Sequence, residues 1–201
     1  MHRLVQFQAI ARSDAGHPSA SEISPPEKGN FPADLLTVLC GVVAQHTSTK
    51  GSCWFCLWDG YGWIDGSPDV SAMVFGPPGD TSNSAAPLSV PPGLPLSVRQ
   101  GARVSLPQRN YFLFKGPLLA ASELGWTTPW ESFDAQSPNL FWPQDHAWCV
   151  ATDIDLFCTL IGGSEKLADA LVAEPRLETW RVFFGDPIAW DSDMVNTRPS
   201  A

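Results

Sequence analysis

The stretch from residue 148 to residue 174 constrains the fold of this chain most. Its first half alternates in the period-2 pattern of a β-strand, and β-branched and aromatic residues continue up to Gly162 and Gly163. This pattern predicts a long central strand, bent or folded into a hairpin around residues 152–155. Ser164 follows, with a side-chain oxygen that can accept from the free amides at the start of a helix. The stretch therefore predicts a strand or hairpin leading directly into a helix.

The remaining segments with a regular pattern are short, and proline or glycine residues separate them. They are a helix at 32–46, strands at 52–59, 111–114 and 177–184, and a short helix at 117–125. This mixture predicts an α+β fold in a single domain spanning residues 1–201. We expect a mixed or antiparallel sheet with helices packed on one face.

Two segments lack periodicity and are rich in proline, glycine and serine. Residues 13–30 predict a loose N-terminal connection, preceded by a short initial strand, and residues 66–101 predict an irregular excursion at the edge of the domain. We expect the excursion to be the least ordered internal part of the chain, because it offers little apolar surface to offset the entropy of ordering.

The charge of the chain restricts its partners. A formal net charge of −9 argues against nucleic acid, whose phosphates attract clustered lysine and arginine, and is compatible with a basic protein partner. Neither a signal peptide nor an apolar run long enough to cross a membrane is evident, so we expect a cytoplasmic protein without a membrane partner. No motif predicts a cofactor.

The cysteines are five in number, and two of them, Cys53 and Cys56, form a C-x-x-C motif. Such a motif can be redox active or half of a zinc site. Here it lies in an aromatic, β-prone run, and residues three apart on a strand point to opposite faces. We therefore expect two reduced, metal-free and buried thiols that do not converge.

Three segments together resemble a known family. They are HTSTKGSCWFCLWDGYGW, RNYFLFKGPL and SPNLFWPQDHAWCVATDIDLFCTLIGGSEKLADALVAEPRLE. The chain resembles, over roughly residues 32–196, a family of uncharacterised bacterial proteins that is best represented in actinobacteria. The resemblance implies no catalytic residue and no activity.

A metal site is the first functional hypothesis. Asp145, His146, Asp153 and Asp155 are carboxylates and an imidazole of the kind that hold divalent metals in hydrolases. On a regular strand Asp153 and Asp155 would share a face. The opposing interpretation is that the aspartates face solvent or cap a turn, since the chain has neither an H-E-x-x-H nor an H-x-E motif.

A binding surface is the second hypothesis, and the one we favour. Tryptophans in glycine- and proline-marked loops, next to carboxylates, suit a basic protein partner or, less well, a sugar. The alternative is that they only cover the ends of a small sheet. The predicted binding residues are Trp58, Asp59, Tyr61, Trp63, Trp126, Trp130, Trp142, Asp145 and His146. The sequence thus favours a non-enzymatic binding protein, for which an immunity-type antitoxin against a basic toxin domain is our specific hypothesis, over a metal-dependent hydrolase.

Overall fold

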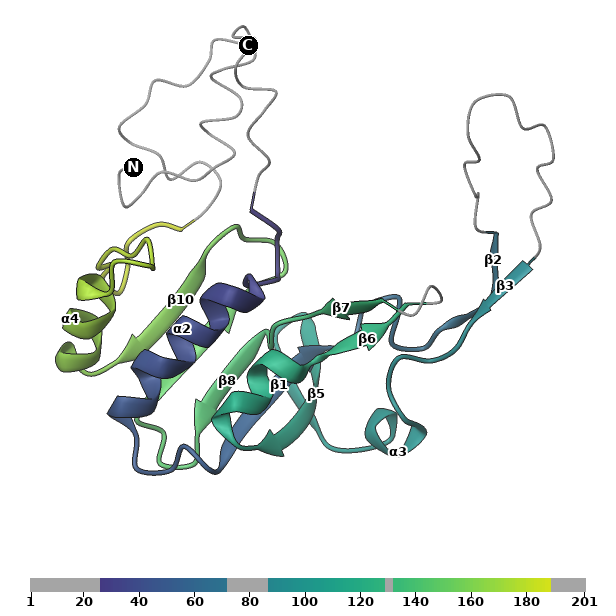
Figure 1. Cartoon of the computed structure of the whole chain (residues 1–201), viewed down its shortest axis with the longest axis horizontal. Helices are drawn as coiled ribbons and strands as arrows, with labels where there is room; N and C mark the ends of the chain where they lie inside the picture. The colour runs from purple at the N-terminus through teal and green to yellow at the C-terminus, as the bar shows by residue number, and fades with distance from the viewer. Residues whose placement is uncertain (1–25, 72–86, 129–131, 189–201) are drawn as a thin grey trace, which may run out of the picture.

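The chain folds around a six-stranded sheet. The structure, a computed structural model, describes residues 26–71, 87–128 and 132–188 (Figure 1). The strand order is β10-β9-β8-β1-β5-β4, and each neighbouring pair is antiparallel. The strands are β1 (Cys53–Trp58), β4 (Arg103–Leu106), β5 (Arg109–Gly116), β8 (Leu140–Pro143), β9 (Trp148–Thr152) and β10 (Thr159–Gly163). A mixed or antiparallel sheet was the expectation, and the sheet is antiparallel.

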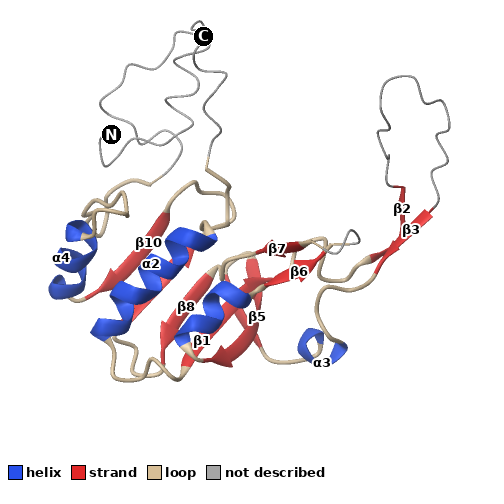
Figure 2. Cartoon of the chain, viewed as in Figure 1, coloured by secondary structure: helices blue, strands red, loops and turns tan. Residues whose placement is uncertain are grey.

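Helices cover one face of this sheet (Figure 2). They are α2 (Ala33–Val43) with the 3-10 turn η2 (Ala44–His46), the 3-10 helix η3 (Leu118–Glu123) and α4 (Glu165–Ala173). Leu39 of α2 and Leu167 of α4 pack in one buried cluster with Phe55, Phe141 and Trp148 of the strands. The prediction of an α+β domain with helices on one face is therefore confirmed.

The stretch that starts at residue 148 is a hairpin followed by a helix. β9 and β10 pair from Thr159 opposite Thr152 to Gly163 opposite Trp148. The amide of Leu167 donates to the Ser164 side-chain oxygen at 3.3 Å, which confirms the predicted cap. The expected central position is wrong, because β10 is an edge strand and β8 and β1 lie in the middle. Alternation reports that a strand buries one face, but it carries no information about strand order.

The predicted excursion at 66–101 contains regular structure in its described part. β2 (Ser67–Ser71) and β3 (Pro87–Val90) form a separate two-stranded sheet, and α3 (Leu96–Arg99) follows. Residues 72–86 lie outside the described residues, and so do residues 1–25, which hold the expected initial strand and most of the loose connection.

The predicted last strand at 177–184 is absent, because these residues form an irregular segment beside α4. A second small sheet, from β6 (Gly125–Thr127) and β7 (Phe133–Ala135), lies in the segment expected to be a loop. Within the described residues, no helix is both long and apolar enough to cross a membrane.

Candidate binding surface

Four of the predicted binding residues form a continuous line of aromatic rings, which we call the aromatic row. Trp58 meets Tyr61 edge to face at 5.3 Å between ring centroids. Tyr61 stacks on Trp63 at 6.1 Å, and Trp63 stacks on Trp126 at 6.2 Å with an angle of 9° between their planes. These distances and orientations are those at which aromatic pairs attract. The row joins the end of β1, the loop that follows it and β6.

Glycines make room for these rings. A Cβ atom on Gly60 would lie 2.2 Å from the Trp58 ring, and one on Gly93 would lie 2.4 Å from the Trp63 ring. The amide of Gly93 also donates to the carbonyl oxygen of Trp63 at 3.0 Å. The backbone at both positions thus lies directly against an indole, where only glycine fits without displacement.

A buried apolar cluster packs against the middle of the aromatic row. Leu57, Ile64, Leu94 and Phe112 are buried together, and Tyr61 and Trp63 are among the half-buried residues packed against them. All four rings of the row are half-buried. The two middle rings of the row are therefore supported by the cluster, while part of the surface of all four residues remains exposed.

A buried polar residue that the sequence analysis missed holds the row in place. The Asn139 side-chain amide donates to the Tyr61 hydroxyl at 2.9 Å, and its oxygen accepts from the Trp58 amide at 2.8 Å. The Tyr61 hydroxyl in turn donates to the Gly29 carbonyl at 3.1 Å. Burial raises the pKa of Tyr61, although the hydrogen bond from Asn139 opposes that rise. No sequence motif identifies Asn139, since its partners come from distant parts of the chain.

Carboxylates flank the row. Exposed Asp134 lies opposite Trp126 in the β6–β7 pair and accepts from its indole nitrogen at 3.3 Å. Asp59 follows Trp58 directly and is half-buried, while exposed Asp65 forms an ion pair with Arg99 at 3.2 Å. Aromatic and acidic side chains therefore lie together along the row, as predicted. Trp130, another predicted binding residue, lies outside the described residues.

Trp142 lies apart from the row, on the sheet face opposite the helices. It pairs with Trp54 across β8 and β1, and alternation with the buried core residue Phe55 places Trp54 on that face. The Lys115 ammonium lies 4.6 Å from the centre of the Trp54 ring. Both tryptophans are half-buried.

Asp145 and His146 occupy the turn between β8 and β9, where Asp145 has a structural role. Its carboxylate accepts from the Ser48 amide and the Thr47 hydroxyl, each at 2.8 Å. Desolvation opposes ionisation, but the hydrogen bonds from Ser48, Thr47 and Ala147 prevail and hold the pKa of Asp145 well below its usual range. His146 is exposed and adopts a left-handed backbone conformation with φ of 54°. Asp145 thus stabilises a turn at the end of β8, and that end pairs with Cys53, at the opposite end of β1 from Trp58.

The predicted Asp/His metal cluster does not assemble. Asp145 and His146 precede β9 and Asp153 and Asp155 follow it, so the length of a strand separates the two pairs. Asp153 accepts from the Asp155 amide at 2.9 Å within a turn, and Asp155 forms an ion pair with Arg109. Among the described residues, no three His, Cys, Asp or Glu side chains are placed to hold a metal. The interpretation of these aspartates as turn residues agrees with this geometry.

The cysteines of the C-x-x-C motif lie on opposite faces of β1, as expected. Cys53 belongs to the helix-covered core, where Cys40 of α2 is also buried. Cys56 is buried on the other face, where the charge of Cys149 on β9 adds to the effect of burial and raises the pKa of Cys56. Burial raises the pKa of Cys56 to about 12 and that of Cys53 to about 11. These thiols are therefore protonated and unreactive at neutral pH.

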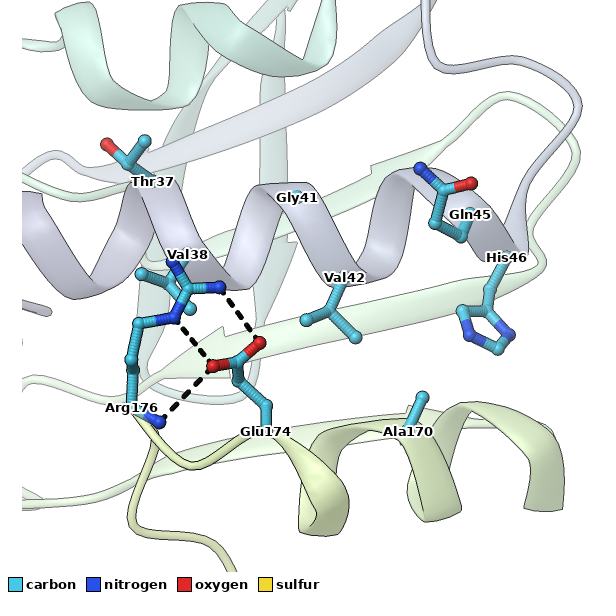
Figure 3. Close-up of a pocket in the computed structure, with 9 residues that line it drawn as sticks. All are labelled: Thr37, Val38, Gly41, Val42, Gln45, His46, Ala170, Glu174 and Arg176. Carbon is cyan, nitrogen blue, oxygen red and sulfur yellow. Dashed lines mark hydrogen bonds and ion pairs between the residues drawn. The ribbon is translucent and has the colours of Figure 1, made fainter.

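A shallow groove of about 500 Å³ runs between α2 and α4 (Figure 3). The carboxylate of Glu174 and the guanidinium of Arg176 on its wall form an ion pair with each other at 2.6 Å. That hydrogen-bonded pairing lowers the pKa of Glu174. Gln45 and His46 stand at the other end of the groove. Because its two opposite charges neutralise each other, the groove has no unpaired charge to recognise a ligand at that end.

The chain matches no protein-family model, no curated protein and no solved structure. The resemblance to an actinobacterial family therefore stays a prediction.

Proposed function

We propose that this chain is a non-enzymatic binding protein that engages a basic protein partner through the aromatic row. The observation that carries this proposal is the parallel stack of Trp63 on Trp126, two half-buried indoles from distant segments, of which Trp63 packs against a buried apolar cluster. Tryptophan is the residue type most enriched among interface residues that dominate binding energy. A preformed stack of this kind loses little side-chain entropy when a partner binds.

Charge supports a basic partner. The chain carries a net charge of −9, and the exposed carboxylate of Asp134 lies at the Trp126 end of the row while Asp59 lies at the Trp58 end. Opposite charge on a partner accelerates encounter, and desolvated aromatic groups then slow dissociation. The specific form of the proposal is an immunity-type protein that neutralises a basic toxin domain.

Co-expression tests this function. Each gene that neighbours the coding sequence is expressed in a host with and without this protein, and growth is followed. We expect one neighbouring product to be toxic alone and harmless with the wild-type chain, and protection to be lost with Trp63→Ala. Trp54→Ala is the matched control, because it removes the same kind of side chain from β1 at a position outside the aromatic row. Protection that survives Trp63→Ala, or a catalytic turnover of the partner, contradicts the proposal.

A further inference from the structure

The carboxylate of Asp134 lies beside the aromatic row without a cationic partner. It is exposed, and it accepts from the indole nitrogen of Trp126, the residue directly opposite on β6, at 3.3 Å. Within the described ranges no lysine, arginine or histidine forms an ion pair with it. Asp65, the other exposed carboxylate of the row, already pairs with Arg99 at 3.2 Å. The described part of the fold thus neutralises Asp65 and leaves Asp134 charged.

The short ribbon of β6 and β7 holds Asp134 and Trp126 in a fixed relation (Figure 1). Gly125 has a φ of 153°, and a Cβ atom there would lie 2.3 Å from the Asp134 carbonyl oxygen, so the strands approach closely only because this residue is glycine. Beyond the other end of the ribbon, the Thr128 amide donates to the Ser132 carbonyl oxygen at 2.8 Å. A carboxylate and a ring that are positioned in advance lose little entropy when a ligand binds.

Other aromatic rings of the protein already carry a cation from their own chain. The guanidinium carbon of Arg103 lies 3.7 Å from the centre of the Phe112 ring, and the Lys115 ammonium lies 4.6 Å from that of Trp54. Among the residues that the structure describes, no such cation lies over a ring of the aromatic row. In a chain with a net charge of −9, the row therefore combines rings that lack a cation with a carboxylate that lacks one.

We propose that the basic partner places an arginine side chain at this end of the row, with its guanidinium against the exposed part of the Trp126 ring and paired with the Asp134 carboxylate. This inference rests on the proposed function and names the chemical group that the row recognises. A guanidinium is planar, so it stacks on an indole while the N–H groups at its edge donate to a carboxylate, whereas the ammonium of lysine is a compact and more strongly hydrated point charge. Tryptophan and arginine are also among the residue types that most often dominate the binding energy of an interface.

Titration of the full chain with short peptides tests this inference without the partner. The probes are acetylated tetrapeptides of arginine, of lysine and of citrulline, an uncharged amino acid with the shape of arginine. The indole N–H signal of Trp126, assigned with Trp126→Phe, is followed by nuclear magnetic resonance. We expect the arginine peptide to shift this signal and to bind about fivefold or more tightly than the lysine peptide, and the citrulline peptide to leave the signal unchanged.

Asp134→Asn isolates the contribution of the carboxylate. The variant loses the charge but keeps an oxygen that accepts from the Trp126 nitrogen, so the ribbon is retained, and the indole signals of the free variant check this. We expect its affinity for the arginine peptide to fall about tenfold, because a charged hydrogen-bond acceptor is removed. Glu178→Gln is the control, since it removes one negative charge from an exposed position after α4 and should bind like wild type.

The outcomes separate this inference from the proposed function. The inference is overturned if no peptide shifts the Trp126 signal, if the lysine or citrulline peptide binds as tightly as the arginine peptide, or if Asp134→Asn binds like wild type. None of these results bears on whether the row binds a partner. The proposed function fails instead if Trp63→Ala still protects in co-expression.

Discussion

The side-chain amide of Asn139 donates a 2.9 Å hydrogen bond to the hydroxyl oxygen of Tyr61. Asn139 is almost completely buried between β1 and β9, whereas Tyr61 belongs to the aromatic row. The same side chain accepts from the Trp58 amide, so one residue of the interior positions two rings of the surface. The geometry of the binding surface therefore depends on a polar contact in the core.

Asn139→Ala should lower the free energy of unfolding by about 2–4 kcal/mol, because it leaves the Trp58 amide and the Thr152 carbonyl without their partner inside the protein. Urea denaturation measures this loss. Tyr61→Phe removes only the hydroxyl and should cost about 1 kcal/mol. Equal losses in the two variants would show that Asn139 contributes little beyond its bond to Tyr61.

Gly93→Ala should disturb the stack of Trp63 on Trp126. The added methyl group would lie 2.4 Å from the Trp63 ring, which must move away. We expect an altered near-ultraviolet circular dichroism spectrum and a loss of stability of about 1–3 kcal/mol. Gly62→Ala in the same loop is the control, since its methyl group meets no atom within 4 Å. A spectrum that Gly93→Ala leaves unchanged would show that the stack tolerates the methyl group.

How far the sequence predicts this protein depends on the range of each interaction. α4 and its Ser164 cap follow from residues that are close in sequence, and so does the β9–β10 hairpin. The strand order does not, because it depends on which distant strands pair. The residues 177–184 favour a strand by composition, but Leu177 enters the core and Thr179 bonds to α4, so tertiary contacts hold this segment against the helix and not in a sheet.

In the candidate site, too, contacts that are local in sequence were predictable and long-range contacts were not. Trp58, Tyr61 and Trp63 were identifiable together because they share one glycine-marked loop. Their contact with Trp126 was not predictable as a stack, since the two segments meet only in the folded chain. Asn139 is not predictable from the sequence for the same reason, and the hydrogen bonds by which Asp145, a predicted binding residue, stabilises a turn also come from a distant segment.

The buried thiols should be inert until the chain unfolds. Burial raises the pKa of Cys40 and Cys56 to about 12, from an ordinary value of 9.0. Desolvation also raises the pKa of Cys149, but this thiol is exposed, so a disulfide reagent at pH 8 should react with it first and with the buried thiols only in denaturant. The folded state also keeps these protons when the unfolded state loses them, so stability should fall as the pH rises above about 9. Rapid labelling of Cys56 in the native protein would contradict this.

Asp145→Asn should destabilise the contact between the β8–β9 turn and the loop after α2. The carboxylate accepts from Ser48 and Thr47, and its pKa is lowered in the folded state. The stabilisation is thus fully present above the unfolded pKa of 3.8 and is lost as the pH falls towards the folded value. Acid titration of thermal stability should therefore be less steep for Asp145→Asn than for wild type. Glu123→Gln, an exposed carboxylate in η3, should keep the wild-type profile.

The affinity of Trp63→Ala for the partner identified by co-expression tests the central claim most directly. Isothermal titration calorimetry compares it with wild type and with Trp54→Ala, after circular dichroism has confirmed that each variant is folded. We predict that Trp63→Ala loses more than about 2 kcal/mol of binding free energy, because it removes the ring stacked on both Tyr61 and Trp126, whereas Trp54→Ala binds like wild type. Unchanged affinity in Trp63→Ala, or an equal loss in Trp54→Ala, would contradict a partner site on the aromatic row.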